Sequence, residues 1–282
     1  GSEQMGGLVK LSYEMSPAWE MGADLNMTHF NASNPGPVSA PRIDNDSHIT
    51  RGMTSFYIEN HYQKTSGAVT AFYNWGHHRI NDGYTAGESP LDYRFDSRDH
   101  MAGVSLYQNL RLFTRNVATV GIDYQHFGGR AWNRYPATDT RQELVDKTLN
   151  DIAGYVDLRQ DIGQLVTLDA GVRFDHNSHV GNEWIPQGGL SLHLPRLMEL
   201  KATVAKGFRN PTLREMYMFP PQNPDLQPER VVNYEIAFSQ RFPQQRLSYG
   251  LNLFYLHGDN LIQTMRVPNG MLNINTGEVN NA

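Results

Sequence analysis

Residues 151–177 read DIAGYVDLRQDIGQLVTLDAGVRFDHN, and this stretch indicates the fold of the chain. Apolar side chains such as Val156 and Leu158 alternate with polar ones such as Asp157, and the alternation resumes after a short turn at 163–164. A period of two residues is typical of a β-strand with two different faces. The stretch therefore predicts two antiparallel strands joined by a tight turn.

The same pattern extends to both ends of the chain, with no helical segment between the runs. Strands are predicted at residues 8–14, 19–30, 48–63, 68–80, 101–113, 117–127, 151–162, 165–177, 184–194, 198–209, 229–242, 247–263 and 271–276. Many of these about thirteen runs reach the roughly 9–11 residues that a tilted strand needs to cross a bilayer. Their length favours a membrane barrel over a β-sandwich.

The connections between these runs alternate between short and long. Tight turns are expected at 16–18, 64–66, 114–115, 163–164, 195–197 and 243–245, and longer loops at 31–47, 81–100, 128–147, 178–183, 210–228 and 267–270. Outer-membrane barrels have short periplasmic turns and longer extracellular loops. We therefore predict an all-β fold, an antiparallel transmembrane β-barrel, in the bacterial outer membrane with lipid as a partner.

The composition excludes several other classes of protein. The 282 residues contain 24 Lys and Arg against 29 Asp and Glu. Proteins that bind nucleic acid carry an excess of positive charge, so we predict that nucleic acid is not a partner. No apolar run is long enough for a transmembrane helix. With no Cys, the chain has no disulfides, Cys-based zinc sites or thiol catalysis. Residues 1–2, Gly-Ser, resemble a scar from tag removal and are set apart from the barrel domain, residues 3–282.

A more specific pattern lies around the loop at 210–228. Residues 206–217 read KGFRNPTLREMY, residues 223–229 read NPDLQPE, and residues 233–235 read NYE. These boxes closely resemble a signature of the barrel of TonB-dependent outer-membrane receptors, including those for haem, siderophores and cobalamin. The residues that carry the resemblance are Phe208, Arg209, Pro211, Leu213, Glu215, Tyr217, Asn223, Pro224, Leu226, Pro228 and Glu229.

The resemblance implies a function as well as a fold. Such receptors have about twenty-two strands around an N-terminal plug, bind a scarce large nutrient outside the cell, and import it when TonB pulls on the plug. The chain is then expected to be an incomplete barrel, with the plug, its TonB-binding segment and the final strands outside it. Such a fragment would not by itself perform energised transport. The alternative is a passive or engineered smaller barrel of twelve to sixteen strands.

Candidate ligand groups lie in two of the predicted loops. The loop at 128–147 offers Arg130, Trp132, Arg134, Tyr135 and Arg141, a mixture suited to an anionic or aromatic ligand at a pore mouth and equally suited to packing on neighbouring loops. In the loop at 210–228, Arg209, Arg214, Glu215 and Glu229 are expected to form bracing ion pairs rather than to touch a ligand.

Cofactor, metal and enzyme readings find little support in the sequence. Haem receptors of the family are expected to carry a His between the two boxes, and residues 212–222 contain none. His77 and His78 are adjacent in a strand, so their side chains point to opposite faces and cannot chelate one metal ion. The acidic loop at 81–100 is expected to be a solvated loop rather than a cation site. We predict no cofactor, no metal site and no enzymatic activity.

Overall fold

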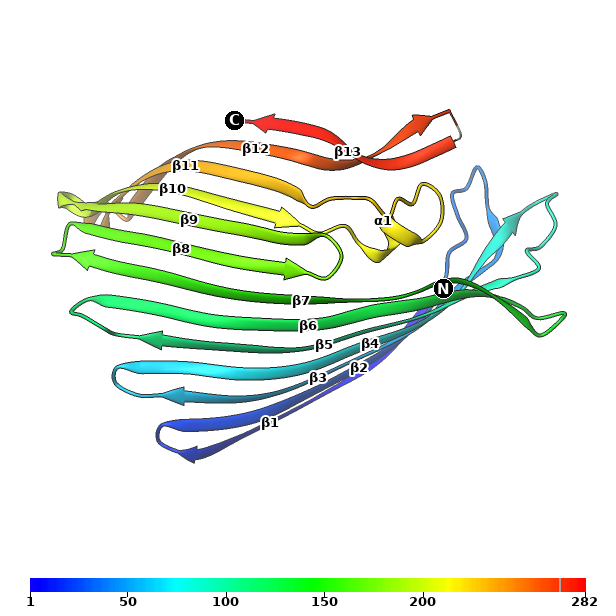
Figure 1. Ribbon diagram of the computed structural model, residues 1–282, viewed down its shortest axis with the longest axis horizontal. Helices are drawn as coiled ribbons and strands as arrows, with labels where there is room; N and C mark the ends of the chain where they lie inside the picture. The colour runs from blue at the N-terminus through cyan, green and yellow to red at the C-terminus, as the bar shows by residue number, and fades with distance from the viewer. Residues whose placement is uncertain (269) are drawn as a thin grey trace. The chain divides into compact units, whose positions relative to one another are not determined.

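The computed structural model describes residues 1–268 and 270–282 and is an antiparallel β-sheet protein (Figure 1). Thirteen strands follow one another in chain order across a single sheet, and each is hydrogen-bonded to its neighbours in the sequence. The prediction of an all-β antiparallel fold with about thirteen strands is confirmed. Among the described residues, no helix is both long and apolar enough to cross a membrane.

The strands are long, and three short helical segments interrupt their connections. The strands are β1 (Ser2–Ser16), β2 (Trp19–Ser33), β3 (Arg42–His61), β4 (Thr65–Thr85), β5 (Arg94–Leu110), β6 (Asn116–Tyr135), β7 (Thr140–Ile162), β8 (Val166–Asn177), β9 (Gly181–Leu194), β10 (Met198–Arg209), β11 (Glu229–Phe242), β12 (Leu247–Val267) and β13 (Gly270–Asn281). The helical segments are η1 (Pro195–Leu197), α1 (Leu213–Tyr217) and η2 (Pro243–Gln245).

Several strands continue into segments that the sequence pattern assigns to loops. β7 begins at Thr140 rather than at residue 151, and β6 ends at Tyr135, so the predicted loop at 128–147 is wrong. The loops at 31–47 and 81–100 are also shorter than predicted, and 178–180 is a tight turn. The strict alternation of short and long connections is therefore wrong in detail. The predicted loop at 267–270 includes residue 269, which lies outside the described residues.

The physical reason is that backbone pairing does not depend on apolar alternation. Residues 140–151 read TRQELVDKTLND, with polar side chains on both faces, so they lose the two-residue period of a lipid-facing strand. Their N–H and C=O groups still gain by pairing with a neighbouring strand, and the ladder continues. Apolar alternation marks where a strand meets lipid, and the hydrogen-bonded strand runs beyond it.

Clustering of contacts divides the chain into two compact units. The first contains Gly1–Glu59, Val69–Ser105 and Tyr124–Asn150, and the second contains Asn60–Ala68, Leu106–Asp123 and Asp151–Ala282. In the first unit, the Trp75 ring covers Gly52, where an added Cβ would lie 2.4 Å from ring atoms. In the second, the Tyr155 ring covers Gly121 in the same way. Glycine thus leaves room for aromatic rings on the sheet surface.

The two faces of the sheet differ as predicted. On β11 the even-numbered Tyr234 and Ile236 are 50% and 55% exposed apolar residues, whereas the odd-numbered Glu235 lies on the other face. Neighbouring strands are aligned so that their apolar residues lie on the same face, because Tyr234 is paired with Val204 on β10 and with Tyr255 on β12. One face is therefore apolar and suited to lipid, and the other is polar and suited to a wet interior.

Candidate functional site

The loop that carries the family boxes is an ordered structure. It begins after β10 and contains α1, whose N-cap is Thr212. The Thr212 Oγ1 accepts a hydrogen bond from the backbone N–H of Glu215 at 3.2 Å, and the Thr212 N–H donates to Glu215 Oε2 at 2.7 Å. This reciprocal pair is a capping box, which satisfies backbone donors that a short helix would leave exposed. The sequence PTLRE thus encodes the turn directly.

Arg209 joins the two ends of this loop. Its Nη1 and Nη2 donate to the two carboxylate oxygens of Glu215 at 3.0 and 3.1 Å, and its Nε donates to Glu229 Oε2 at 2.6 Å. Arg209 and Glu229 are also direct partners in the β10–β11 register. Such a two-pronged arrangement suits the planar guanidinium group. The predicted bracing ion pairs are therefore present for these three residues, whereas Arg214 contributes its backbone carbonyl to Met218.

The electrostatics of Glu215 follow from this geometry. Burial on its own would raise the pKa of Glu215, but hydrogen bonds from Arg209 and Thr212 and the charge of Arg209 hold that pKa below its ordinary value. The carboxylate is therefore ionised throughout the neutral range and keeps both the cap and the ion pair in place.

The remaining motif residues pack the loop onto its surroundings. Met216 and Leu226 are 0% and 1% exposed, and Pro228 is also fully buried. Pro211 is buried, while Phe208 and Leu213 are half-buried. These buried side chains hold the loop in place by packing.

Hydrogen bonds fasten the same loop to β13. The Asn223 Nδ2 donates to the carbonyl of Asn273 at 2.7 Å, and the N–H of Asn273 donates to the carbonyl of Pro221 at 2.7 Å. The N–H of Gln227 donates to Asn275 Oδ1 at 2.8 Å. The loop is thus held at both ends and along its middle.

One residue near this loop was missed by the sequence reasoning. His179, in the turn between β8 and β9, lies beside Tyr217 with ring centroids 5.8 Å apart. Its Nε2 also lies 2.8 Å from the carbonyl oxygen of Pro224. Burial raises the pKa of Tyr217. No local pattern could have indicated His179, because it precedes Tyr217 by 38 residues and only the fold brings them together.

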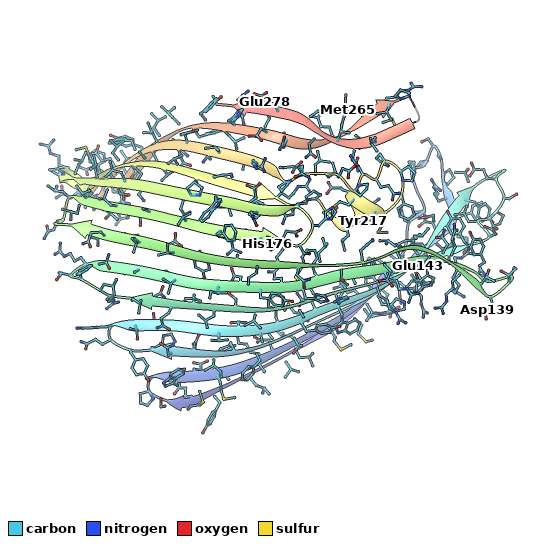
Figure 2. The ribbon with its side chains drawn as sticks, viewed as in Figure 1. Asp139, Glu143, His176, Tyr217, Met265 and Glu278 are labelled. Carbon is cyan, nitrogen blue, oxygen red and sulfur yellow. The ribbon has the colours of Figure 1, made fainter. Side chains whose placement is uncertain are left out.

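The second group of candidate residues lies on a strand rather than in a loop. Arg130, Trp132, Arg134 and Tyr135 all belong to β6, which corrects their assignment to a loop. Figure 2 shows β6 and β7 side by side beyond Glu143, up to the turn near Asp139. Tyr135 donates a hydrogen bond from its hydroxyl to Gln142 Oε1 at 2.9 Å. Arg134 lies 3.5 Å from Asp96 of β5.

The polar face of the second unit carries a network of charges. Glu183 of β9 is 5% exposed and forms ion pairs with Lys206, at 3.0 Å, and with Arg230. Arg173 of β8 forms ion pairs with Asp123 and Asp175. Near these strands a cavity of about 590 Å³ has Thr119, Asp157, Arg159, Asp169 and Gln187 in its lining. The pairing satisfies most of these charges, so the network holds the wall together and leaves its surface hydrophilic.

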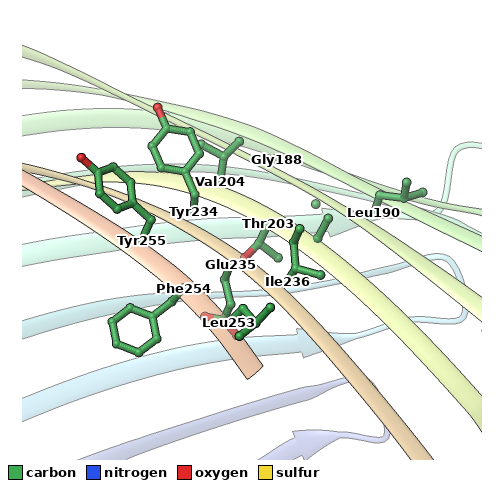
Figure 3. Close-up of a pocket in the computed structure, with 12 residues that line it drawn as sticks. Gly188, Leu190, Thr203, Val204, Tyr234, Glu235, Ile236, Leu253, Phe254 and Tyr255 are labelled. Atoms are coloured by element: carbon green, nitrogen blue, oxygen red, sulfur yellow. The ribbon is translucent and has the colours of Figure 1, made fainter. Parts of the chain in front are cut away.

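A different hollow lies on the apolar face (Figure 3). Its volume is about 590 Å³, and its lining includes the small residues Gly188, paired with Val204, and Ala202, paired with the larger Ile236. Small residues beside large ones leave this depression between strands. Leu253 and Tyr255 in its lining are exposed on the apolar face, whereas Thr203 and Glu235 belong to the other face, so the hollow offers no converging set of polar groups for a nutrient.

The described residues contain no metal cluster. In residues 1–268 and 270–282, no group of three or more His, Asp or Glu side chains is arranged to hold a metal ion. His77 lies 3.5 Å from Asp96, and His78 lies 3.5 Å from Asp99. The two histidines therefore have separate partners.

Comparison with known proteins assigns the family. The sequence pattern described as "TonB dependent receptor-like, beta-barrel" matches residues 13–282. The iron-regulated outer membrane virulence protein of Vibrio cholerae is 24% identical over 248 residues, which cover 81% of this chain and 35% of that protein. The vitamin B12 transporter BtuB of Photobacterium profundum is 27% identical over 112 residues, which cover 40% of this chain and 18% of the transporter. The chain thus spans about a third of the length of the Vibrio cholerae relative.

Solved structures share the fold. The siderophore receptor PirA of Pseudomonas aeruginosa matches 98% of this chain and 48% of the receptor, with a TM-score of 0.71 and 17% identity. The copper transporter OprC matches 99% of this chain and 49% of the transporter, with a TM-score of 0.78 and 11% identity. The chain is therefore an outer-membrane protein of a transporter family and not an enzyme. It belongs to the family of TonB-dependent receptor β-barrels.

Proposed function

We propose that this chain forms part of the barrel wall of a receptor for TonB-energised uptake of a scarce, large nutrient, with a ferric siderophore as the first candidate. The observation that carries the proposal is the family match over residues 13–282. The iron-regulated relative and the fold shared with a siderophore receptor favour iron as the cargo. Cobalamin is the second candidate, because two relatives are named as vitamin B12 transporters.

In this proposal the complete protein closes about twenty-two strands around a plug that contains the TonB-binding segment. The charged polar face, with Glu183 and Arg173 in ion pairs, is suited to a plug or to water rather than to lipid. A smaller, passive barrel would use the same wall without an energy source. The two hypotheses therefore differ in their requirement for TonB.

The motif residues have a supporting role in this proposal. Arg209, Glu215 and Glu229 hold the loop between β10 and β11 as a rigid part of the rim, fastened to β13 through Asn223. A ligand arriving from outside would meet a preformed surface. Pre-organisation reduces the entropy lost on binding.

Uptake of labelled nutrients tests the proposal. Cells that lack other iron receptors and express the complete gene would be supplied with radioactive iron as ferric enterobactin or with radioactive cobalamin, with and without an intact tonB gene. We expect TonB-dependent accumulation of one of the two, with iron as the first candidate. Accumulation of neither, or accumulation that does not need TonB, would refute the energised-receptor proposal. A parallel gel of the outer membrane confirms that the protein is present in each strain.

A further inference from the structure

The loop-side ends of β5 and β6 carry arginines on the face that meets lipid. On β6, Tyr124 is 43% exposed on the apolar face, and both its hydroxyl and His126 Nδ1 lie within 3.0 Å of Asn150 Oδ1. His126 therefore shares the face of Tyr124. The ring of His100 on β5 lies 5.5 Å from that of His126, which places His100 there too. The apolar face thus becomes basic and aromatic towards these strand ends.

Two residues before His100 on β5, Arg98 reaches the ring of Trp132 at 6.0 Å. Two further arginines approach the same ring, Arg130 at 6.0 Å and Arg141 of β7 at 5.5 Å. Strand alternation puts Arg98 on the face of His100, and Arg130 and Trp132 on the face of His126. We refer to Arg98, Arg130, Trp132 and Arg141 as the arginine cage.

The arginine cage surrounds a cavity of about 210 Å³, whose lining also includes Glu143. Trp132 is only 8% exposed, and within the described part of the chain its buried indole Nε1 has no hydrogen-bond partner. A buried N–H donor without an acceptor is costly, so an acceptor supplied to this donor would stabilise the folded wall. The size of the cavity suits a group such as a phosphate.

The charges in the arginine cage are only partly balanced. Arg130 pairs with Glu143 at 2.6 Å and with Asp146 at 3.6 Å. Across the described residues, neither Arg98 nor Arg141 makes an ion pair with a carboxylate. Next to the cage, Asp96 has two cationic neighbours at 3.5 Å, namely Arg79 and Arg134. The whole surface therefore has more arginine than carboxylate, and its vacant donors favour an anion.

We propose that the arginine cage binds a phosphate of a phosphorylated glycolipid headgroup in the outer leaflet. Arg130 lies six residues beyond Tyr124, which is about 20 Å along the strand and about 15 Å along the membrane normal at the usual tilt. A sugar-phosphate headgroup reaches that height, whereas a simple phospholipid headgroup remains close to the acyl chains. Because the cage lies on the face that meets lipid, an occupant from the membrane has direct access to it.

The competing hypothesis is that Arg130 and Trp132 contact the imported nutrient, as their composition alone suggests. A nutrient would have to reach them from the face that meets lipid, because Asp99, which alternates with Arg98 and His100 on β5, points to the other face and pairs there with Arg51. All three arginines of the cage are exposed, so a phosphate at the surface can reach their planar donor groups. The face of the sheet therefore favours the lipid.

Titration with lipid A tests the proposal. The protein, purified from its own outer membrane in mild detergent, would be titrated with bis-phosphorylated lipid A and with the same lipid A after removal of its phosphates, and bound lipid would be counted by native mass spectrometry. We expect phosphorylated lipid A to bind at least about tenfold more tightly to the parent protein than to the R98Q/R141Q double variant. The dephosphorylated lipid should not distinguish the two proteins.

Matched variants separate binding from folding. Arg266→Gln removes an exposed arginine of β12 outside the arginine cage and should leave lipid binding unchanged. Trp132→Phe keeps an aromatic ring but removes the spare N–H donor, and should weaken binding by about threefold. Heat-modifiable migration on a gel shows whether a variant has folded. If the R98Q/R141Q double variant has not folded, Trp132→Phe takes its place in the titration.

Three results would overturn the proposal. The first is equal binding of phosphorylated and dephosphorylated lipid A, and the second is unchanged affinity in both the double variant and Trp132→Phe. The third is a result that assigns the arginine cage to a soluble anion. Either selective binding of inorganic phosphate by the parent protein, or loss of siderophore uptake in the double variant with lipid binding intact, would be such a result. If the variants lose binding of phosphorylated lipid A and of no other lipid, the proposal is supported, whatever nutrient the receptor imports.

Discussion

Two arginine-rich regions of this protein use the same side chain in opposite ways. In the loop between β10 and β11, Arg209 is saturated by the carboxylates of Glu215 and Glu229. In the arginine cage, by contrast, Arg98 and Arg141 gather around Trp132 without carboxylate partners of their own among the described residues. The arginine of the first region is fully engaged by carboxylates of the chain, and two arginines of the second region retain donors for a partner outside it.

The difference shows how to distinguish arginines that stabilise the fold from arginines that bind a ligand. We refer to the loop between β10 and β11, held by Arg209, Glu215 and Glu229, as the brace. A guanidinium group that makes all its hydrogen bonds within the chain contributes to local stability. Guanidinium groups that gather around one ring repel one another, and a bound anion reduces this repulsion. Composition alone cannot separate the two cases, because both regions contain Arg, Glu and aromatic residues.

The largest effect is expected from the core of the brace. Met216→Ala would empty a fully buried position, and we expect it to destabilise the protein by about 2–4 kcal/mol. Thermal unfolding in detergent measures the change. Met271→Ala is the matched control, since Met271 is 50% exposed and its truncation should cost little. Equal losses for the two variants would contradict the assignment of α1 to the packed interior.

Exchanging arginine for glutamine in both regions tests the comparison directly. Arg209→Gln should release Glu215 and Glu229 and cost about 1–2 kcal/mol, whereas Arg98→Gln should change stability by less than about 0.5 kcal/mol. Hydrogen exchange of the amides at 212–217 should accelerate in the first variant only. If Arg98→Gln proved as destabilising as Arg209→Gln, the arginine cage would be a second brace.

Acid should loosen the brace through Glu215. Because the pKa of Glu215 lies below its ordinary value of 4.5, its ionised form stabilises the folded loop at neutral pH. That contribution is complete above the ordinary value and is lost as the pH falls through the lower, folded-state pKa. We expect amide protection at 212–217 to be constant from pH 7 to about pH 5 and to fall below about pH 4.

The Glu215→Gln variant is the control for this pH effect. It cannot ionise, so it should show reduced protection at neutral pH and a flatter response to acid. A loss of protection centred near pH 6 in the parent protein would contradict the assignment of the acid effect to Glu215.

The smallest effect concerns the one carboxylate that lines the cavity of the arginine cage. Glu143→Gln removes a negative charge that pairs with Arg130 on an exposed surface. Surface pairs are weak, so stability should hardly change, while phosphorylated lipid A should bind about two- to threefold more tightly. Weaker binding would mean that Glu143 is needed to orient Arg130.

Some particulars of the fold could be predicted because they depend on neighbouring residues. The bounds of β10 and β11 agree with the alternation in the sequence, since lipid and water meet opposite faces of these strands. The capping box at Thr212 and Glu215 is also local, because its two residues are three positions apart. The start of β7 at Thr140 could not be predicted, because outside the lipid its side chains lose the alternation.

The partners of the candidate residues depend on register instead. Arg98 and Arg141 meet Trp132 only because β5, β6 and β7 lie side by side with a particular offset. A shift of one residue would turn each of these side chains to the other face. His179 likewise reaches Tyr217 only through the order of the strands between them.

The amino-acid sequence by itself determined the class of fold, the number of strands, the apolar and polar faces and the family, because alternation and short motifs act over a few neighbouring residues. The tertiary structure alone decided which arginines are neutralised and which remain available. The physical reason is that charge pairing acts across strands, between residues that only the register of the sheet brings within a few ångströms.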